Sequence, residues 1–517
     1  MRTRRFFGLL ALCVAATAGP LLAADRPTVG TLSIPRLAAP PPLDPRAPAT
    51  AWQGTAPVPM SWDVTHQRPA SERASALIGT DGGSLYVRFD IKQREGLLAQ
   101  QHVNDVGDGT DDEVWIDLWP NGPAGFFYQF AATSNGTHFQ YSSENTAYAP
   151  TWESRGAAYN GGFTVTMKIP LDVIRGSRAS GSWRAQFVRV IRSTGEREIW
   201  SYAPAQTNGD DVTYAGDIRG LAAAKSTHPK ARFAPYALGA IGPSTSGLTT
   251  SRVGLDFAIP ITETASIVTT LHPDYSNLEI DQETIAPTAY ARFYSETRPF
   301  FTQLSNYLDS FDCDACPGIS QLYTPNIPTP REGYAIEGSQ GFARFAAFDA
   351  IGDHRTDAAQ VFKTVTPDNR WRLTLQRVAA DTPFVHDDVG TGGLAYNDNK
   401  HISAYFNYGN DSGSNVALGN HAQRYDGGAY LYTNTFGAAL AMRKVGYYYN
   451  PADGLVQHPD IAGYAFYSAK EWLFNKNDVL NEAGLDVFID RYHNAAGDLN
   501  QSDSSLLIDL LTANRID

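Results

Sequence analysis

A short strand-like stretch carries the residue types that saccharide recognition needs. Trp115 and Trp119 flank Asp117 at every second position, so a strand would place all three side chains on one face. Sugars stack their C–H groups on flat aromatic rings, and polar side chains hold their hydroxyls. We therefore predict a carbohydrate-binding surface here. The alternative is that both rings pack against a second layer of protein.

An acidic loop with glycines precedes this stretch. Asp108, Asp111 and Asp112 lie close together in the chain, and calcium in an exported protein takes about six to eight oxygen ligands from such loops. Calcium is therefore a candidate cofactor, with these three carboxylates as candidate ligands. The alternative is a set of solvated turn acids, because the spacing does not fit an EF-hand.

Two cysteines stand in the motif Cys-Asp-Ala-Cys, at Cys313 and Cys316. In an exported chain this spacing favours a local disulfide. A redox motif would need a strand-to-helix context, and a zinc site would need two further ligands; neither is readable from the sequence.

Catalytic motifs are not recognisable in the sequence. It has no His-Glu-Xaa-Xaa-His, no Gly-Xaa-Ser-Xaa-Gly and no phosphate-binding glycine loop. Glu279 and Asp281 could form a glycosidase pair, which requires two carboxylates about 5–9.5 Å apart. They alternate with apolar residues such as Ile280, which favours polar groups facing a lumen. Glu296 and Arg298 are expected to form an ion pair in a lumen or plug.

Composition excludes several classes of protein. The chain has 517 residues and a net charge of −13 without a basic run, so nucleic acid is not an expected partner. With 12% aromatic and 18% charged residues, it is too apolar for a disordered protein. Residues 1–24 begin with arginines and continue as an apolar run that ends in alanines, which predicts a secretory signal peptide. No later run is long and apolar enough for a transmembrane helix.

The first half of the mature chain alternates in the manner of half-buried strands. Residues 85–91, 114–119 and 163–169 each place apolar side chains at every second position, between turns rich in Gly, Asn and Asp. We predict an antiparallel β-sandwich over residues 43–204. The Pro- and Ala-rich residues 25–42 and the polar residues 205–230 are predicted to be linkers.

The second half, residues 231–517, continues the alternation with a different chemistry. Residues 253–259, 371–376, 402–408 and 485–490 have one apolar and one polar or charged face. Such segments of about ten residues are typical of an outer-membrane β-barrel, although a soluble sandwich or propeller would alternate too. Tyrosines such as Tyr430, Tyr449 and Tyr467 are expected at headgroup level near strand ends.

Residues 43–170 resemble family 9 carbohydrate-binding modules. The resemblance lies in the order of short motifs, each of them weak alone: Leu43-Asp44, Trp52, Ala76-Leu77-Ile78, Leu85-Tyr86-Val87, Asp111-Asp112-Glu113-Val114-Trp115-Ile116-Asp117, Trp152 and Gly161-Gly162-Phe163. It implies a saccharide ligand, and Trp52, Trp115 and Trp152 as the best candidates for the rings that enclose it. Lys168 departs from the family, which usually has an acidic residue before Ile-Pro.

A second resemblance covers the chain from residue 43 to about residue 350. His272-Pro273-Asp274-Tyr275-Ser276-Asn277, Phe293-Tyr294-Ser295-Glu296-Thr297-Arg298-Pro299 and Pro328-Thr329-Pro330-Arg331 are similar to a bacterial outer-membrane barrel family of unknown function. Its members carry an N-terminal family 9-like module. The end of this chain, Asn514-Arg515-Ile516-Asp517, departs from the terminal aromatic residue that such barrels usually have, so we expect unusual closing strands or a truncated chain.

These observations predict an all-β protein, a sandwich followed by an outer-membrane-type barrel. The expected function is capture of a polysaccharide or oligosaccharide at the bacterial envelope, with outer-membrane lipid as the other partner. We expect the module to be periplasmic or to fill the mouth of the barrel. The alternatives are a carbohydrate-active hydrolase that acts on O-glycosyl bonds and a transporter fed by the module.

Overall fold

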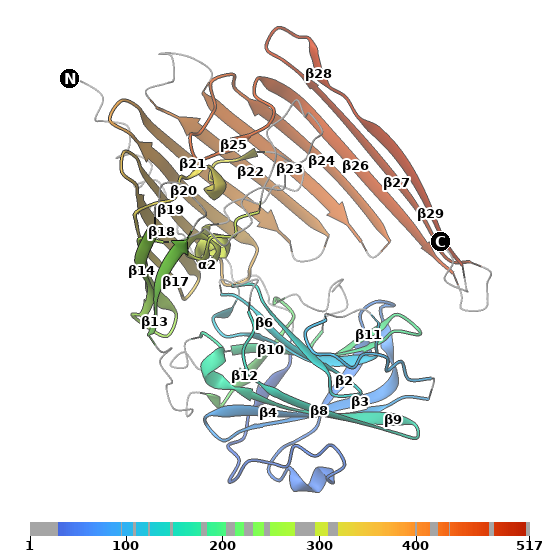
Figure 1. Cartoon of the computed structure of the whole chain (residues 1–517). Helices are drawn as coiled ribbons and strands as arrows, with labels where there is room; N and C mark the ends of the chain where they lie inside the picture. Colours follow the sequence, from blue (N-terminus) through green and yellow to red (C-terminus); the bar gives the residue numbers. More distant parts are fainter. Residues whose placement is uncertain are drawn as a thin grey trace, which may run out of the picture.

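The structure is a computed structural model with two large antiparallel sheets, one above the other in Figure 1. It describes residues 29–512 except 95, 107–109, 123–124, 145–147, 177–182, 203–211, 222–230, 242–248, 274–294, 309–318, 399–400, 414–421, 434 and 475–479. The predicted signal peptide, the Cys313–Cys316 disulfide, Asp108, Glu279 and Asp281 lie outside these residues. The all-β prediction is confirmed.

The first sheet folds over on itself to form a sandwich, which we call the module. Its strands are β1 (Thr31–Ser33), β2 (Val58–Asp63), β3 (Arg68–Thr80), β4 (Ser84–Lys92), β5 (Glu113–Trp119), β6 (Tyr128–Thr133), β7 (His138–Ser142), β8 (Glu153–Tyr159), β9 (Gly162–Pro170), β10 (Trp183–Ile191), β11 (Glu196–Ile199) and β12 (Gly216–Arg219). The strand order is β7-β6-β5-β10-β11-β2-β3-β4-β9-β8, and β12 joins β1 to β10. The short β11–β2 pairing connects the two layers.

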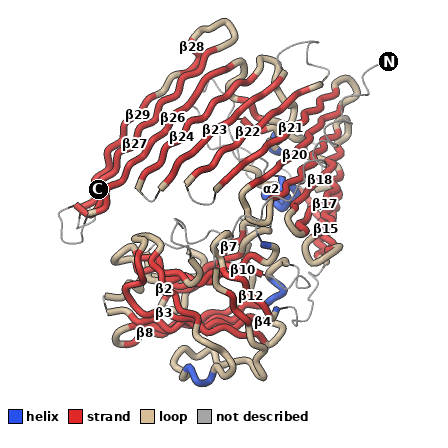
Figure 2. Tube along the Cα trace, turned by 180° about the vertical axis from the view of Figure 1, so that it is seen from behind, coloured by secondary structure: helices blue, strands red, loops and turns tan. Residues whose placement is uncertain are grey.

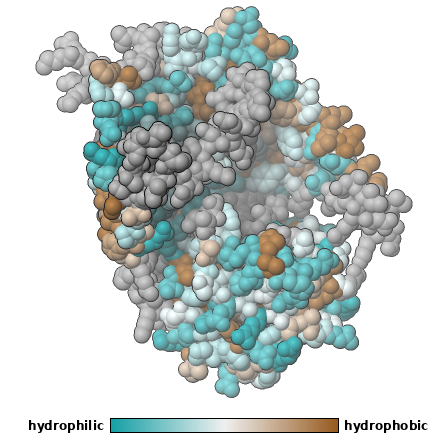
Figure 3. Space-filling view, in the orientation of Figure 1, coloured by the Kyte–Doolittle hydropathy of each residue, from teal (hydrophilic) through white to brown (hydrophobic). Residues whose placement is uncertain are grey.

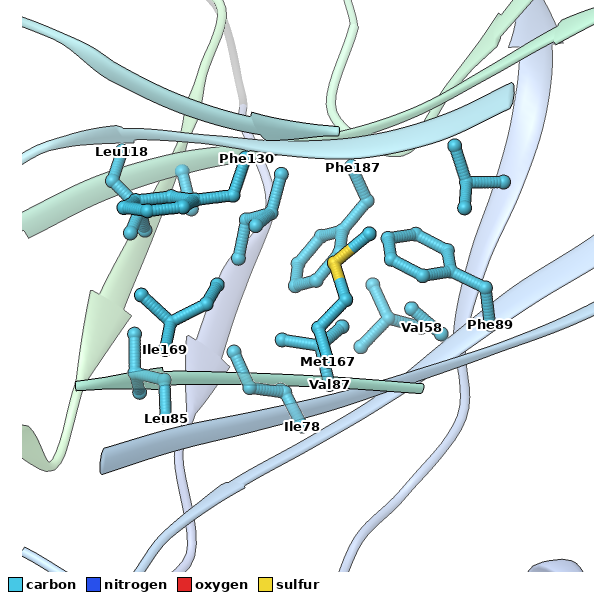
Figure 4. Packing of buried hydrophobic residues seen from close by; sticks show 14 of the residues in the cluster. Val58, Ile78, Leu85, Val87, Phe89, Leu118, Phe130, Met167, Ile169 and Phe187 are labelled. Carbon is cyan, nitrogen blue, oxygen red and sulfur yellow. The ribbon is translucent and has the colours of Figure 1, made fainter. Parts of the chain in front are cut away.

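Alternating apolar side chains from both layers meet in one core (Figure 4). Leu118, Phe130 and Phe187 come from one layer, and Val87 and Met167 come from the other. All five are fully buried. The two-residue period that predicted a sandwich is therefore the period with which side chains enter this core.

The module includes residues from both predicted linkers. β1, within residues 25–42, pairs in parallel with β12, within residues 205–230. β12 in turn pairs with β10 through contacts such as Trp183 with Ile218. Proline- and glycine-rich composition weakens strand propensity locally, but an existing sheet edge supplies hydrogen-bond partners that composition does not reveal.

The second sheet, which we call the wall, is a long meander. Its strands are β13 (Arg232–Ile241), β14 (Thr249–Pro260), β15 (Ala265–Leu271), β17 (Glu332–Gln340), β18 (Ala343–Ile351), β19 (Thr356–Val365), β20 (Trp371–Asp381), β21 (His386–Asn397), β22 (Ile402–Asp411), β23 (Gln423–Tyr432), β24 (Phe436–Val445), β26 (Ile461–Leu473), β27 (Leu480–His493), β28 (Leu499–Gln501) and β29 (Ser504–Thr512). From β13 to β27 each strand of the wall pairs with the next one, and β28 and β29 both pair with β27. The wall curves, so that β17 and β18 stand edge-on in Figure 2. Over the described residues, no pairing joins β13 to β29.

The two faces of the wall differ in chemistry. On β20 the exposed Leu375 alternates with the buried Thr374 and Gln376, and on β22 the exposed Phe406 alternates with the buried Asn407. On these strands the convex face is therefore apolar and the concave face polar, as the sequence predicted. Apolar side chains also gather along the edge over β29, at the right of Figure 3. Among the described residues no helix is long and apolar enough to span a membrane.

Part of the predicted tyrosine girdle is wrong. Tyr449 is fully buried in a cluster with Val389 and Tyr492. Tyr430 and Tyr467 line a cavity on the concave face. The sequence places these rings near strand ends, but a two-residue period does not say which connections fold back over the concave face.

The connection between β15 and β17 enters the concave side of the wall. It carries helix α2 (Pro299–Leu308), whose buried residues Phe301 and Leu304 pack against Phe348 and Val361 of the wall. The approach is close at Gly333, where a Cβ would lie 2.9 Å from the Phe300 ring. It also carries β16 (Ile319–Ser320), which pairs with β25 (Leu455–Val456) in the connection between β24 and β26.

Candidate functional site

The predicted surface on β5 is covered in the structure. Trp115 and Trp119 are 2% and 5% exposed, and Asp117 is fully buried. Trp115 donates its Nε1 hydrogen to Asp117 Oδ2 at 3.1 Å, and the Arg197 guanidinium lies 5.4 Å from its ring centroid. The opposite strand face enters the main core, whereas Trp115 belongs to a second, smaller cluster. This arrangement matches the alternative in which the rings pack against a second layer.

Trp52 and Trp152 are also packed against protein. Trp52 is 2% exposed in a cluster with Leu77 and Tyr86. Trp152 is 5% exposed, meets the Phe130 ring edge-on at 5.3 Å and lies 4.4 Å from the His138 ring. A sugar cannot stack on covered indoles, so a binding role for these residues requires a conformational change and stays a prediction.

The two described acids of the predicted calcium loop accept hydrogen bonds from the protein. Asp111 accepts the backbone N–H groups of Gln100 and Gln101 at 2.9 and 2.7 Å. Asp112 accepts those of Leu98 and Arg192 at 3.0 and 2.8 Å. These bonds tie the loop before β5 to neighbouring backbone. Among the residues that the structure describes, no group of three His, Cys, Asp or Glu side chains could hold a metal ion.

A charged cluster joins the module to the wall, and we call it the junction. Arg175 lies in the connection between β9 and β10 of the module. Its guanidinium pairs with Glu144 of the module and donates to Glu337 Oε1 of β17 at 3.0 Å. It also donates to Ser266 Oγ of β15 at 3.0 Å. Burial would lower the pKa of Arg175, but the negative charges of Glu144 and Glu337 help to raise it above its ordinary value, so the guanidinium stays charged at this contact.

Two tyrosines complete the hydrogen bonding of Glu144. Tyr128 of β6 donates to one carboxylate oxygen, and Tyr307 of α2 donates to the other at 2.7 Å. Burial, together with the negative charge of Glu144, raises the pKa of Tyr128 well above its ordinary value. Both hydroxyls therefore remain donors, and Glu144 is satisfied by module, helix and guanidinium together.

Aromatic, cation–π and neutral polar contacts extend the junction. Phe126 of the module meets the Tyr307 ring edge-on at 4.7 Å. The guanidinium of Arg344, from β18, lies 4.6 Å from the centroid of the Phe126 ring. Asn121 Nδ2 donates to Ser339 Oγ of β17 at 3.1 Å. Side chains from three elements of the wall and from α2 thus hold one end of the module.

The predicted ion pair at the start of α2 is present. Arg298 Nη2 donates to Glu296 Oε2 at 2.7 Å, and its guanidinium lies 4.4 Å above the Phe301 ring. Arg298 also donates to the Ile327 carbonyl at 2.8 Å. Burial would raise the pKa of Glu296, but the hydrogen bonds that it accepts from Arg298 outweigh burial and hold this pKa below its ordinary value. Glu296 is therefore an ionised group that fixes the turn before α2.

The module meets the end of the wall that has short connections. Ser266, Glu337, Ser339 and Arg344 all lie within a few residues of the turns at 261–264 and 341–342. Because the strands form a simple meander, β19 and β21 also end on this side, at Val365 and Asn397. The chain leaves the opposite end into its long connections at Leu271, Asp411 and Val445, and the short connections 352–355 and 382–385 lie at that end as well.

Sequence reasoning missed the junction. Arg175 and Glu144 lie in loops of the module, and Tyr307 lies in a helix that an alternating pattern does not predict. For helix α2 the sequence offered one signal, the Glu-Thr-Arg-Pro stretch at 296–299, in which a charged turn is followed by proline at the first position of the helix.

Comparison with known proteins adds similarities of fold. No family model matches the sequence, and the search of curated proteins finds no match. Among solved structures, a family 9 carbohydrate-binding module from Caldicellulosiruptor kristjanssonii in complex with cellotriose is 14% identical, covering 37% of this chain and 92% of its own, with a TM-score of 0.27. A triple mutant of the Rhodopseudomonas blastica porin is 7% identical, covering 77% and 98%, with a TM-score of 0.26. OpdO of Pseudomonas aeruginosa is 8% identical, covering 87% and 92%, with a TM-score of 0.26. The fold described here rests on the strand pairing itself.

Proposed function

We propose that this chain is a bacterial outer-membrane protein whose wall lies in lipid and carries the module as a cap. One observation carries the proposal: the adjacent strands β20 to β24 expose large apolar residues on the convex face and cover polar residues on the concave face. Leu375, Leu394 and Phe406, from three adjacent strands, are 47–53% exposed. Soluble proteins rarely expose a continuous apolar face of this extent, whereas the lipid-facing side of a membrane sheet requires one.

The position of the junction supports a periplasmic module. Outer-membrane barrels have short turns on the periplasmic side and longer loops outside the cell. The contacts of the module lie beside the short connections 261–264 and 341–342. The module would therefore close the periplasmic end of the wall, while α2 extends from the long-connection side to meet it.

A saccharide is the ligand that we propose for the module. The order of its motifs resembles family 9 carbohydrate-binding modules, and the sandwich fold is present. Polysaccharides or oligosaccharides of the envelope would be within its reach in the periplasm. The predicted tryptophans are covered in this conformation, so sugar binding through them would require a conformational change.

Fractionation with two arginine variants tests the membrane assignment. The full chain is expected to sediment with outer membranes after a urea wash. Leu375→Arg, on the convex face, should lower the free energy of unfolding by about 2–4 kcal/mol in lipid. Phe384→Arg is the control, because Phe384 is 93% exposed in the connection 382–385 and should tolerate the charge. Recovery as a soluble protein, or equal effects of both variants, would refute the assignment.

The saccharide assignment needs a separate experiment. The full chain in detergent should be retained on at least one insoluble polysaccharide, such as cellulose, chitin or peptidoglycan. Absence of retention on all of these, together with absence of binding on a broad glycan array, would refute it while leaving the membrane assignment intact.

A further inference from the structure

A cavity of about 360 Å³ lies on the concave face of the wall, away from the junction. Strands β23, β24, β26 and β27 form its floor, and the connection between β24 and β26 covers it in part through Gln457 and His458. This volume lies in the lower part of the range for small-molecule sites in proteins.

Small side chains make the floor of the cavity flat. Ala441 of β24 pairs directly with Ala465 of β26, and Ala439 lies two residues before Ala441 on the same face. Aromatic side chains stand around this floor: Tyr430 comes from β23, and Tyr467, which is 41% exposed, comes from β26. A ring-shaped ligand could therefore lie on the alanines and contact aromatic faces at its sides.

Polar groups of balanced charge line the same cavity. Arg443 is 7% exposed, with its guanidinium 5.9 Å from the Tyr492 ring centroid. Asp490 lies on β27, and β26 separates it from Arg443 on β24. Asp490 accepts hydrogen bonds from Gln501 Nε2 at 2.8 Å and from the Asp503 backbone N–H at 2.7 Å. One cation and one carboxylate face the same space. The lining therefore provides donors and acceptors for hydroxyls without excess charge that would select an ion.

His458 adds a neutral group on the covering side. Burial, with Arg443 as a second cause, lowers the pKa of this imidazole. At neutral pH the ring is uncharged, so it adds a donor and an acceptor to the lining and leaves the charge balance between Arg443 and Asp490 unchanged.

We propose that this cavity is a binding site for a neutral mono- or disaccharide. Aromatic faces would contact the C–H groups of the sugar ring, and the side chains of Arg443 and Asp490 would bind its hydroxyls. The site lies on the wall, so it is separate from the module and goes beyond the saccharide role proposed for the module.

Isothermal titration of the full chain in detergent tests the proposal, with glucose, maltose, cellobiose and lactose as probes. At least one probe should bind saturably. Tyr467→Ala should weaken its affinity at least tenfold, because it removes an aromatic face, whereas Tyr467→Phe keeps the ring and should retain most of the affinity. Tyr464→Ala is the matched control, because Tyr464 is an exposed tyrosine on the opposite face of β26, and it should bind like the unmodified chain.

Three results would overturn the site. The first is that none of the four probes binds. The second is that binding survives Tyr467→Ala unchanged, which would place the sugar outside this cavity and leave the proposed function standing. The third is that benzoate binds more tightly than every sugar, which would make the cavity a site for aromatic anions. Tyr467→Phe keeps the test valid if Tyr467→Ala does not fold.

Discussion

Trp152 illustrates why aromatic residues in a binding-module motif can serve the fold instead. Its indole packs against the rings of Phe130 and His138, and its Nε1–H donates a hydrogen bond to Gln140 Oε1 at 2.8 Å. We predict that Trp152→Ala lowers the free energy of unfolding by about 3–5 kcal/mol, because it leaves a cavity in the core. Urea denaturation of the full chain measures this loss. Val103→Ala, at a position 62% exposed, should change stability by less than about 0.5 kcal/mol; equal effects would contradict the packing role.

His138 makes the stability of the module depend on pH. Burial lowers its pKa below the ordinary value of 6.5, so the unfolded chain binds a proton more readily than the folded one. The contribution of His138 is therefore complete above pH 6.5 and is lost as the pH falls from 6.5 to the lower pKa of the folded state. We predict that His138→Gln reduces the loss of stability between about pH 7.5 and pH 5.5. Identical pH profiles for both proteins would contradict this.

Residue types alone predicted which faces are apolar but not what covers them. The alternation around Trp115 correctly separates Ile116, in the main core, from Trp115 on the other side of the strand. The guanidinium of Arg197 that covers Trp115 comes from β11, distant in sequence. Such a contact depends on long-range strand pairing, for which a single sequence contains no direct signal.

At the scale of elements, α2 fills space on the concave side of the wall. Leu304 is fully buried there, whereas Ser305, the next residue, is exposed. We predict that Leu304→Ala lowers the free energy of unfolding by about 2–5 kcal/mol. Ser305→Ala should have little effect or stabilise slightly, since alanine favours a helix. Denaturation of both variants in the same detergent decides between this packing and a helix that only lies on the surface.

The elements that the sequence predicted best are those with a strict two-residue period. In β22, the apolar Ile402 and Phe406 do face outward and Asn407 faces inward. Helix α2 and strands β1 and β12 were missed for a physical reason. Each is short, and each is stabilised by a partner that lies far away in the sequence, such as Phe348 for α2.

At the scale of the whole molecule, the junction determines how the module sits on the wall. We predict that cysteines replacing Asn121 and Ser339, whose side chains are in contact, form a disulfide in a chain with serine at positions 313 and 316. Arg175→Ala should reduce its yield, because Glu144 and Glu337 would then lie together without their cation, a change that typically costs about 3–5 kcal/mol. Arg372→Ala, on the wall away from the junction, is the control. An unchanged yield in Arg175→Ala would contradict the role of this cluster.

The central claim is that the convex face of the wall lies in lipid, and a labelling scan along β20 tests it most directly. A fluorescent label would be attached to single cysteines at Leu373, Thr374, Leu375 and Gln376, with Cys313 and Cys316 replaced by serine, and the protein would be reconstituted in vesicles that contain spin-labelled lipid. Our account predicts strong quenching by lipid at positions 373 and 375, and weak quenching at 374 and 376, which face the concave side. Uniform quenching, or the strongest quenching at 374 and 376, would contradict it.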